Sequence, residues 1–202
     1  MTKIFIKTDN SYLSDKVSMR SNHLPDKEEV NVLDAYSSNG IIWRLVQDMN
    51  PATRFNIARL DKEASKQGFY IKTDNLRFLL STDLNVYDVI DLDAYGVPYK
   101  QLEILFRKAE NFDHVVKVFV TFNTVGMGQM PKGMLKYLGI TEEMIANSPI
   151  LCSKSPEEKI AGYLSVKGVR QLHRRKTYTG NNYHCYVCFD VGGEENESNL
   201  CT

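Results

Sequence analysis

From residue 31 onward the chain alternates short β-branched or apolar runs with longer amphipathic runs, and this alternation restricts the fold more than any other feature. The short runs have the length and composition of buried strands, whereas the longer runs have the period of helices. Such βα units build a mostly parallel sheet with helices on both faces, an α/β fold. The predicted strands are Asn31–Tyr36, Phe55–Leu60, Phe69–Thr73, Tyr87–Leu92 and Val115–Phe122. The predicted helices between them are Gly40–Met49, Lys62–Lys66, Asn75–Leu80 and Tyr99–Glu110.

The pattern changes after the fifth predicted strand. A loop rich in glycine and methionine, Thr124–Gly128, leads into helical runs at Pro131–Leu138 and Thr141–Ala146 and a third helix that begins at Ser155. Two β-rich runs follow, Arg170–Tyr178 and Tyr183–Val191, separated by a Thr-Gly-Asn-Asn segment that favours a hairpin. The sequence therefore predicts a seven-stranded, mostly parallel sheet that ends in an antiparallel hairpin.

The hydrophobic content of 43% over 202 residues is enough for one continuous core. We expect a single domain over residues 31–191, preceded by an extension (1–30) with a strand at Ile4–Lys7 and a helix near Leu13–Arg20. The acidic, glycine-rich tail (192–202) is expected to be disordered. No apolar run approaches the roughly 18 residues of a membrane helix, and the N-terminus does not resemble a signal peptide. We therefore expect a soluble, cytoplasmic protein with no membrane partner.

Charge and cysteine content leave the partner open. Twenty-five basic and 25 acidic residues cancel, so no net charge indicates a nucleic-acid partner. A local basic cluster at Arg170 and His173–Lys176 is either a phosphate-backbone contact or a solvated strand face. The four cysteines are interpreted as reduced thiols. Zinc binding is disfavoured because Cys185 and Cys188 would point to opposite faces of one strand, so no metal is predicted.

The first candidate site segment joins the first predicted strand to the first predicted helix. It reads Asp34-Ala35-Tyr36-Ser37-Ser38-Asn39-Gly40. Small residues let the backbone approach a ligand, and a helix start offers free N–H groups to an anion. The Gly-x-Gly-x-x-Gly pattern of dinucleotide-binding folds is absent, which disfavours NAD. The alternative is an ordinary strand-to-helix turn.

Acidic residues follow the next two predicted strands. Asp61 stands where a carboxylate can accept from both hydroxyls of a ribose. Asp74, with its neighbour Asn75, could receive an adenine amino group. Helix capping is the alternative role for Asp61 and Asp74.

Two carboxylates close the fourth predicted strand. Strand alternation places Asp91 and Asp93 on the same side, where a buried carboxylate is costly unless a ligand or a donor uses it. The loop after the fifth strand, from Asn123 and Thr124 onward, should border the same pocket, as a substrate lid or as a plain connection. Function is therefore sought at this edge of the sheet.

At these residues the sequence resembles the class I (Rossmann-like) S-adenosylmethionine-dependent methyltransferases, and among them the tRNA guanine-N2 dimethyltransferase family. That family's first motif reads like Asp-Ala-Leu-Ser-Ala-Ser-Gly, against Asp34–Gly40 here. Its fourth motif reads Asp-x-Asp-Pro-Tyr/Phe-Gly, against Asp91-Leu92-Asp93-Ala94-Tyr95-Gly96 here. The resemblance spans about residues 30–125, and the closing hairpin fits the same fold.

The resemblance implies S-adenosylmethionine as the cofactor and an amino group on an RNA base as the methyl acceptor. It implies that Asp61 holds the ribose, Asp74 the adenine, and the segment from Tyr36 to Gly40 the methionine end. Asp93 and the Ala94 carbonyl would hold the target amine, and Tyr95 would stack on the base. The implied cofactor-binding set is Asp34, Tyr36, Ser37, Ser38, Gly40, Asp61, Asp74, Asn75 and Asp91, and Asp91 is also a candidate catalytic residue.

The sequence departs from the family at three points. Ala94 replaces a proline, Ile41 and Ile42 stand where the family has arginines, and the family's second, RNA-binding domain is not found in this chain. Partners consistent with these departures are RNA, such as tRNA, or a subunit that binds RNA. The alternatives are a small-molecule or protein acceptor, and a non-catalytic protein that keeps the fold for binding.

Overall fold

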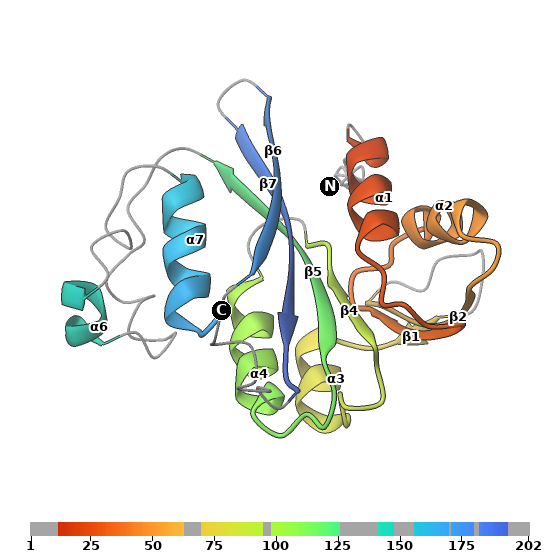
Figure 1. The fold of residues 1–202 in the computed structure, drawn as a ribbon, viewed down its shortest axis with the longest axis horizontal. Coiled ribbons are helices and arrows are strands. Elements are labelled where there is room, and N and C mark those ends of the chain that lie inside the picture. Colours follow the sequence, from red (N-terminus) through yellow and green to blue (C-terminus); the bar gives the residue numbers. More distant parts are fainter. Residues whose placement is uncertain are drawn as a thin grey trace, which may run out of the picture.

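The computed structural model describes residues 12–62, 70–94, 98–125, 141–147, 156–169, 171–179 and 182–193. Seven strands within these residues form one sheet in the order β3-β2-β1-β4-β5-β7-β6 (Figure 1). Strands β1 to β5 run parallel, and β7 lies antiparallel between β5 and β6. This arrangement confirms the predicted parallel sheet and closing hairpin. The strands are β1 (Glu29–Asp34), β2 (Arg54–Asp61), β3 (Ile71–Lys72), β4 (Val89–Leu92), β5 (Val116–Val125), β6 (Leu172–Thr179) and β7 (Asn182–Val191).

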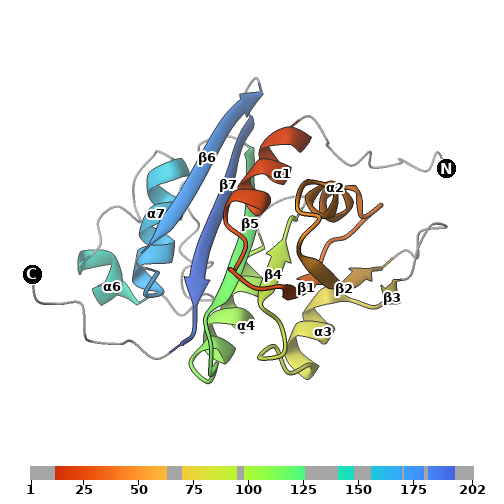
Figure 2. The same cartoon turned by 45° about the vertical axis from the view of Figure 1, so that its right-hand side comes forward.

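Helices cover both faces of the sheet, and each face has its own hydrophobic core (Figure 2). The described helices are α1 (Leu13–Asn22), α2 (Ile41–Met49), α3 (Asn75–Ser81), α4 (Tyr99–Ala109), α6 (Glu142–Asn147) and α7 (Pro156–Val166). Helices α3, α4 and α7 pack on one face, around Leu33, Leu102 and Tyr163. Helices α1 and α2 pack on the other, around Val32, Trp43 and Phe119. None of the described helices combines the length and apolar character needed to cross a membrane.

Alternation along the strands explains the two cores. Val32 and Leu33 are adjacent on β1, are both fully buried and belong to different cores. A central strand covered on both faces therefore carries adjacent buried apolar residues, as at Val32 and Leu33 of β1 and at Val89 and Ile90 of β4.

Several element boundaries differ from the predictions. Strand β5 continues to Val125, three residues beyond its predicted end, because β7 pairs with it from Val116 to Val125. Asn123 and Thr124, predicted to begin a loop, are therefore strand residues. Strand β3 is only two residues long in the described part, and β1 begins earlier, at Glu29, which pairs with Arg54.

Some predictions fall outside the described residues. These are the strand at Ile4–Lys7, the helix at Pro131–Leu138, nearly all of Lys62–Lys66, most of the tail, and the glycine-containing segment 126–128.

Candidate functional site

The carboxyl ends of β1, β2 and β4 bring the candidate carboxylates to one edge of the sheet. Asp34 is the register partner of Asp91 on β4 and of Arg59 on β2. Asp61 ends β2, and Asp93 follows β4 directly. Residues that are paired in a parallel sheet point to the same face, so Arg59, Asp34 and Asp91 lie in one row on the face that carries α1 and α2.

The loop from β1 to α2 is fixed by backbone hydrogen bonds to its neighbours. The Ala35 amide donates to the Asp91 carbonyl at 3.0 Å, and the Ser37 amide donates to the Leu60 carbonyl at 3.2 Å. Ser38 (φ 47°) and Gly40 (φ 65°) have left-handed backbone conformations, which allow the chain to turn sharply into α2. Asn39 accepts from the Ile41 amide through Oδ1 at 3.1 Å.

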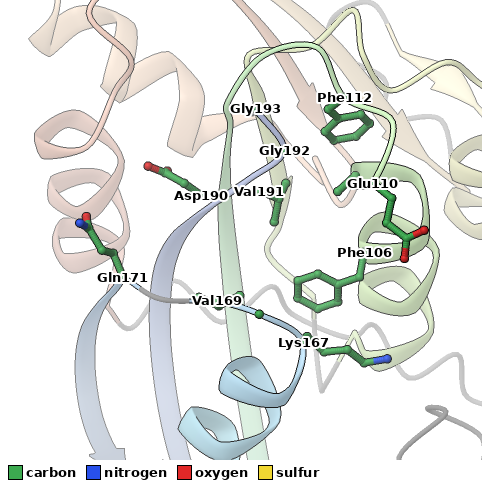
Figure 3. A pocket seen from close by; sticks show the side chains of 12 residues that line it. Phe106, Glu110, Phe112, Lys167, Val169, Gln171, Asp190, Val191, Gly192 and Gly193 are labelled. Carbon is green, nitrogen blue, oxygen red and sulfur yellow. The ribbon is translucent and has the colours of Figure 1, made fainter. Parts of the chain in front are cut away.

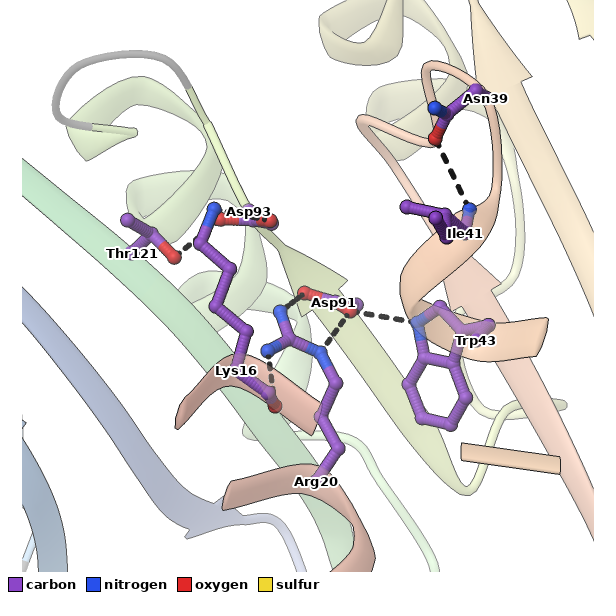
Figure 4. A network of polar contacts seen from close by, with 8 residues as sticks. All are labelled: Lys16, Arg20, Asn39, Ile41, Trp43, Asp91, Asp93 and Thr121. Atoms are coloured by element: carbon purple, nitrogen blue, oxygen red, sulfur yellow. Dashed lines mark hydrogen bonds and ion pairs between the residues drawn. The ribbon is translucent and has the colours of Figure 1, made fainter. Parts of the chain in front are cut away.

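Asp91 is buried in a dense polar network (Figure 4). Arg20 of α1 donates to both of its carboxylate oxygens at 2.7 Å, and Trp43 of α2 donates its indole N–H to Oδ2 at 2.7 Å. Burial opposes the charge of Arg20, but Asp91, together with the negative charges of Asp93 and Asp34, outweighs burial and raises the Arg20 pKa above its ordinary value. Asp91 therefore anchors α1 and α2 to the sheet.

Asp93 is held by a lysine and a threonine. Lys16 of α1 donates from Nζ to Oδ2 at 2.9 Å, and the Thr121 hydroxyl of β5 donates to Oδ1. Burial would raise the pKa of Asp93, but Arg20 and Lys16 outweigh it and hold the pKa below its usual value. Asp93 is therefore ionised in this setting and already has two donors.

Asp34 has a different environment. The residue is 5% exposed, and no described ion pair includes it. Burial, followed by the negative charge of Asp91, raises the pKa of Asp34 to about 7. The nearby Ser37 hydroxyl opposes this rise but completes no hydrogen bond to the carboxyl. Asp34 is thus a buried carboxyl that would gain from a positively charged group.

The remaining cofactor candidates lie around the start of α3. Asp74 is the N-cap of this helix, accepting from the Leu76 and Arg77 amides, and it pairs with Lys62 at 2.7 Å. Asp74 therefore has the helix-capping role that the sequence offered as its alternative. The Asn75 amide donates weakly to the Ala35 carbonyl at 3.4 Å, which links α3 to the β1–α2 loop. Burial raises the pKa of Tyr36 in that loop to about 12.

Not every predicted site residue can be placed. Ala94 is buried at the end of β4, whereas Tyr95 and Gly96 lie outside the described residues. The backbones of Asn123 and Thr124 pair with His184 and Tyr183 on β7. The structure therefore brings together the ends of β1, β2 and β4 and leaves the aromatic part of the fourth motif undescribed.

Three residues of this region were missed by the sequence reasoning. Lys16 and Arg20 lie four residues apart on α1, so they share one helix face and reach Asp93 and Asp91 together. Arg59 lies on β2 beside the β1–α2 loop. The available signal was the need for counter-ions, because two buried carboxylates require cations from elsewhere in the chain.

The hairpin cysteines lie on opposite faces, as predicted from their spacing. Cys185 belongs to the core on the α4 side and Cys188 to the core on the α1 side, and neither forms a disulfide. Burial raises the pKa of Cys188 to about 12. Of the basic cluster, His173 and Arg174 are exposed, and His173 stacks on His23 with ring centroids 4.1 Å apart.

A cavity of about 650 Å³ lies at the opposite edge of the sheet (Figure 3). It is bordered by the ends of α4, α7 and β7, and the end of β7 pairs with the start of β5. Its lysine, Lys167, is paired with Glu103, Asp190 is paired with Lys117, and Glu110 is exposed to solvent. None of the predicted site residues lines this cavity.

No protein-family model matches the sequence, and no curated protein matches it. Solved structures do match the fold. TYW2 of M. jannaschii, in complex with AdoMet, is 12% identical with a TM-score of 0.52, over 95% of this chain and 80% of that one. A protein from Clostridium thermocellum that is assigned as an rRNA methylase is 15% identical with a TM-score of 0.50, over 90% of this chain and 96% of that one.

Phosphoethanolamine N-methyltransferase 2 of Haemonchus contortus also matches. It was crystallised with phosphomonomethylethanolamine and S-adenosylhomocysteine, and it is 12% identical with a TM-score of 0.54. The match covers 90% of this chain and 53% of that one. Together with the strand order, these likenesses show that the chain has the Rossmann-like fold of the class I methyltransferases.

Proposed function

We propose that the protein is an S-adenosylmethionine-dependent methyltransferase. The observation that carries the proposal is the Asp34 carboxyl, which is buried at the carboxyl end of β1 without a described ion pair and has a pKa of about 7. Ligands of open α/β sheets bind at this edge. The same fold in structures solved with AdoMet and S-adenosylhomocysteine supports the choice of ligand.

The charges around Asp34 fit this cofactor. Of the three carboxyls at Asp34, Asp91 and Asp93, Arg20 pairs with Asp91 and Lys16 pairs with Asp93. Asp34 is the one of the three that takes part in no described ion pair. S-adenosylmethionine carries a sulfonium and an ammonium, and either charge would favour the ionised form of Asp34. The left-handed conformations of Ser38 and Gly40 let the loop that follows Asp34 turn sharply at the carboxyl end of β1, where the cofactor would bind.

The chain's own residues have distinct roles in the proposed reaction. When bound, the cofactor supplies an electrophilic methyl group on its sulfonium. Asp34 would hold the cofactor's positive charge, and Asp61 its ribose. Asp91 would hold α1 and α2 in place beside the site by accepting from Arg20 and Trp43. Asp93 would accept from the amino group of the substrate and orient its lone pair toward the methyl group.

The proposed acceptor is an amino group on an RNA base, as in the tRNA guanine-N2 dimethyltransferases. The fourth motif supports this choice, since Asp93 lies directly after β4 and keeps its negative charge. Lys16 and Thr121 already donate hydrogen bonds to the Asp93 carboxylate, so a target amine would be a third donor to it. RNA, or a subunit that binds RNA, is accordingly the proposed partner.

Calorimetric titration with S-adenosylmethionine and S-adenosylhomocysteine tests the first step. We expect both to bind the wild type, and binding to tighten as the pH rises from 6 to 8 because Asp34 must lose its proton. Asp34→Asn should bind more weakly and lose this pH dependence, whereas Asp48→Asn, an exposed control on α2, should behave as the wild type. A wild type that binds neither compound at millimolar concentration would refute the proposal.

Methyl transfer to total tRNA, measured with a tritiated cofactor, tests the acceptor. Asp93→Asn should reduce incorporation while leaving cofactor affinity nearly unchanged, and Asp190→Asn is the matched control. Equal incorporation by Asp93→Asn and the wild type would overturn the role of Asp93. Cofactor binding without transfer to RNA would favour a different acceptor or a non-catalytic binding protein.

A further inference from the structure

Arg59 packs near the last residue of the β1–α2 turn, Gly40, directly before α2 begins. A Cβ atom on Gly40 would lie 3.1 Å from Arg59 Cζ and 3.3 Å from both Nε and Nη1. Gly40 is the N-cap of α2. The guanidinium of Arg59 therefore lies at the amino end of a nine-residue helix, in direct contact with the N-cap glycine.

This position is electrostatically unfavourable for an arginine without a partner. The amino end of a helix carries a partial positive charge, and anions are the groups that it stabilises. No acidic residue occupies the first turn of α2. Arg59 takes part in none of the ion pairs among the described residues. The Arg59 guanidinium and the positive amino end of α2 thus lie together, and no described acidic side chain neutralises them.

Two buried polar atoms beside this point lack hydrogen-bond partners. Arg59 Nε is buried and donates to no described acceptor. Ser37 is 6% exposed, and its buried hydroxyl also has no partner. The Ser37 amide donates to the Leu60 carbonyl, so Ser37 lies next to the strand that carries Arg59. Buried donors without acceptors are uncommon in folded proteins, and a ligand is one recognised reason for them.

Asp34 does not supply the missing anion. It is the register partner of Arg59 on the neighbouring strand and points to the same face, yet no described ion pair joins the two. Two neighbouring strands thus carry, at paired positions, a carboxyl and a guanidinium that take part in no described ion pair. Such a pair matches a ligand that carries both an ammonium and a carboxylate.

We infer that Arg59, with the Ser37 hydroxyl and the amino end of α2, forms an oxyanion-binding site for the ligand's carboxylate. The inference rests on the proposed function and identifies the anion as the α-carboxylate of the cofactor's methionine part. Arg59 is then the residue that selects amino acid-bearing forms of the cofactor. A charge-assisted hydrogen bond of this kind changes affinity by about 10- to 100-fold.

Calorimetry with two ligands tests this inference. S-adenosylmethionine is compared with decarboxylated S-adenosylmethionine, which lacks only the carboxylate. The wild type should bind S-adenosylmethionine about 10- to 100-fold more tightly. Arg59→Gln should bind the two equally and should bind the decarboxylated form as the wild type does. Arg59→Lys keeps the charge and should keep part of the preference. Arg44→Gln, an exposed arginine on α2, should keep all of it.

The outcomes separate the inference from the proposed function. A wild type that binds both ligands equally, or an Arg59→Gln variant that keeps the preference, overturns the role of Arg59 and leaves the proposed function standing. A variant that loses affinity for both ligands to the same extent shows a structural role and also overturns it. A wild type that binds neither ligand refutes the proposed function and this inference together.

Millimolar inorganic phosphate should compete with S-adenosylmethionine in the wild type only. Competition by phosphate without any preference for the carboxylate would assign the site to another oxyanion and overturn the inference.

Discussion

At the scale of single residues, three carboxyls near the ends of β1 and β4, two of them buried and that of Asp93 partly buried, differ sharply in their environment. Asp91 has a bidentate arginine and an indole, and Asp93 has a lysine and a hydroxyl. Asp34 has neither arrangement, and its pKa rises to about 7. The pKa of Asp34 is raised whereas that of Asp93 is lowered, and neighbouring carboxyls shifted in opposite directions are typical of sites that bind or react.

The raised pKa of Asp34 gives a testable dependence of stability on pH. The folded protein keeps this proton up to about pH 7, whereas the unfolded chain loses it near pH 4. Stability from this group is therefore present at low pH and lost as the pH rises through 7. The free energy of unfolding of Asp34→Asn, measured by urea denaturation, should rise relative to that of the wild type by about 3 kcal/mol between pH 5 and pH 8. A constant difference between the two proteins would contradict this.

Removing the partner of Arg20 should be far more damaging than breaking an exposed ion pair. Asp91→Asn leaves a buried guanidinium without its counter-ion and should lower the free energy of unfolding by about 3–5 kcal/mol. The same substitution at Asp190, which pairs with Lys117 at the surface, should cost less than about 1 kcal/mol. Chemical denaturation of both variants measures the contrast, and similar losses would show that Asp91 is not an anchor.

At the scale of elements, the start of α2 depends on a glycine. Gly40 and Gly168 both have positive φ, at 65° and 84°, but a Cβ on Gly168 would meet nothing within 4 Å. Gly168→Ala should therefore cost only the conformational strain, about 1 kcal/mol. Gly40→Ala adds a contact with Arg59 and should cost about 2–3 kcal/mol. Thermal unfolding of the two variants gives the difference, and equal losses would mean that Arg59 moves aside freely.

The elements themselves were largely predictable, because periodicity and turn residues report local structure directly. The helix runs that became α2, α3 and α4 and the hairpin of β6 and β7 were found within a few residues of their bounds. The end of β5 was missed because its last residues are ordered by pairing with β7, which is distant in sequence. Local pattern carries no information about such a partner.

At the scale of the whole molecule, one sheet separates two cores and should make them unfold together. Trp43, the only tryptophan, lies in the core beneath α1 and α2, whereas Leu33 lies in the opposite core. Leu33→Ala should destabilise the protein by about 2–5 kcal/mol. Trp43 fluorescence and far-UV circular dichroism should report the same shift, because the loss on one face is felt on the other. A fluorescence transition that stays at its wild-type midpoint would show two independent units.

The candidate site was only half predictable from the sequence. Its acidic residues, Asp34, Asp61, Asp91 and Asp93, lie at or next to strand ends, and strand ends can be recognised from the local pattern. Their cations cannot, because Lys16 and Arg20 come from a helix that precedes the sheet and Arg59 lies within a strand. Which charges meet in space is a property of the tertiary arrangement, and composition alone left all 25 basic residues equivalent.

The insertion of β7 between β5 and β6 has a consequence for the order of folding. Val116 pairs with Val191, so the two ends of this contact are separated by most of the second half of the chain. Long-range strand pairing of this kind slows folding, and chains emerge from the ribosome starting at the amino terminus. A nascent chain that has released β5 therefore still exposes that strand's edge until β7 emerges. Through that interval we expect the newborn protein to be at its most vulnerable to aggregation and to need shielding by chaperones.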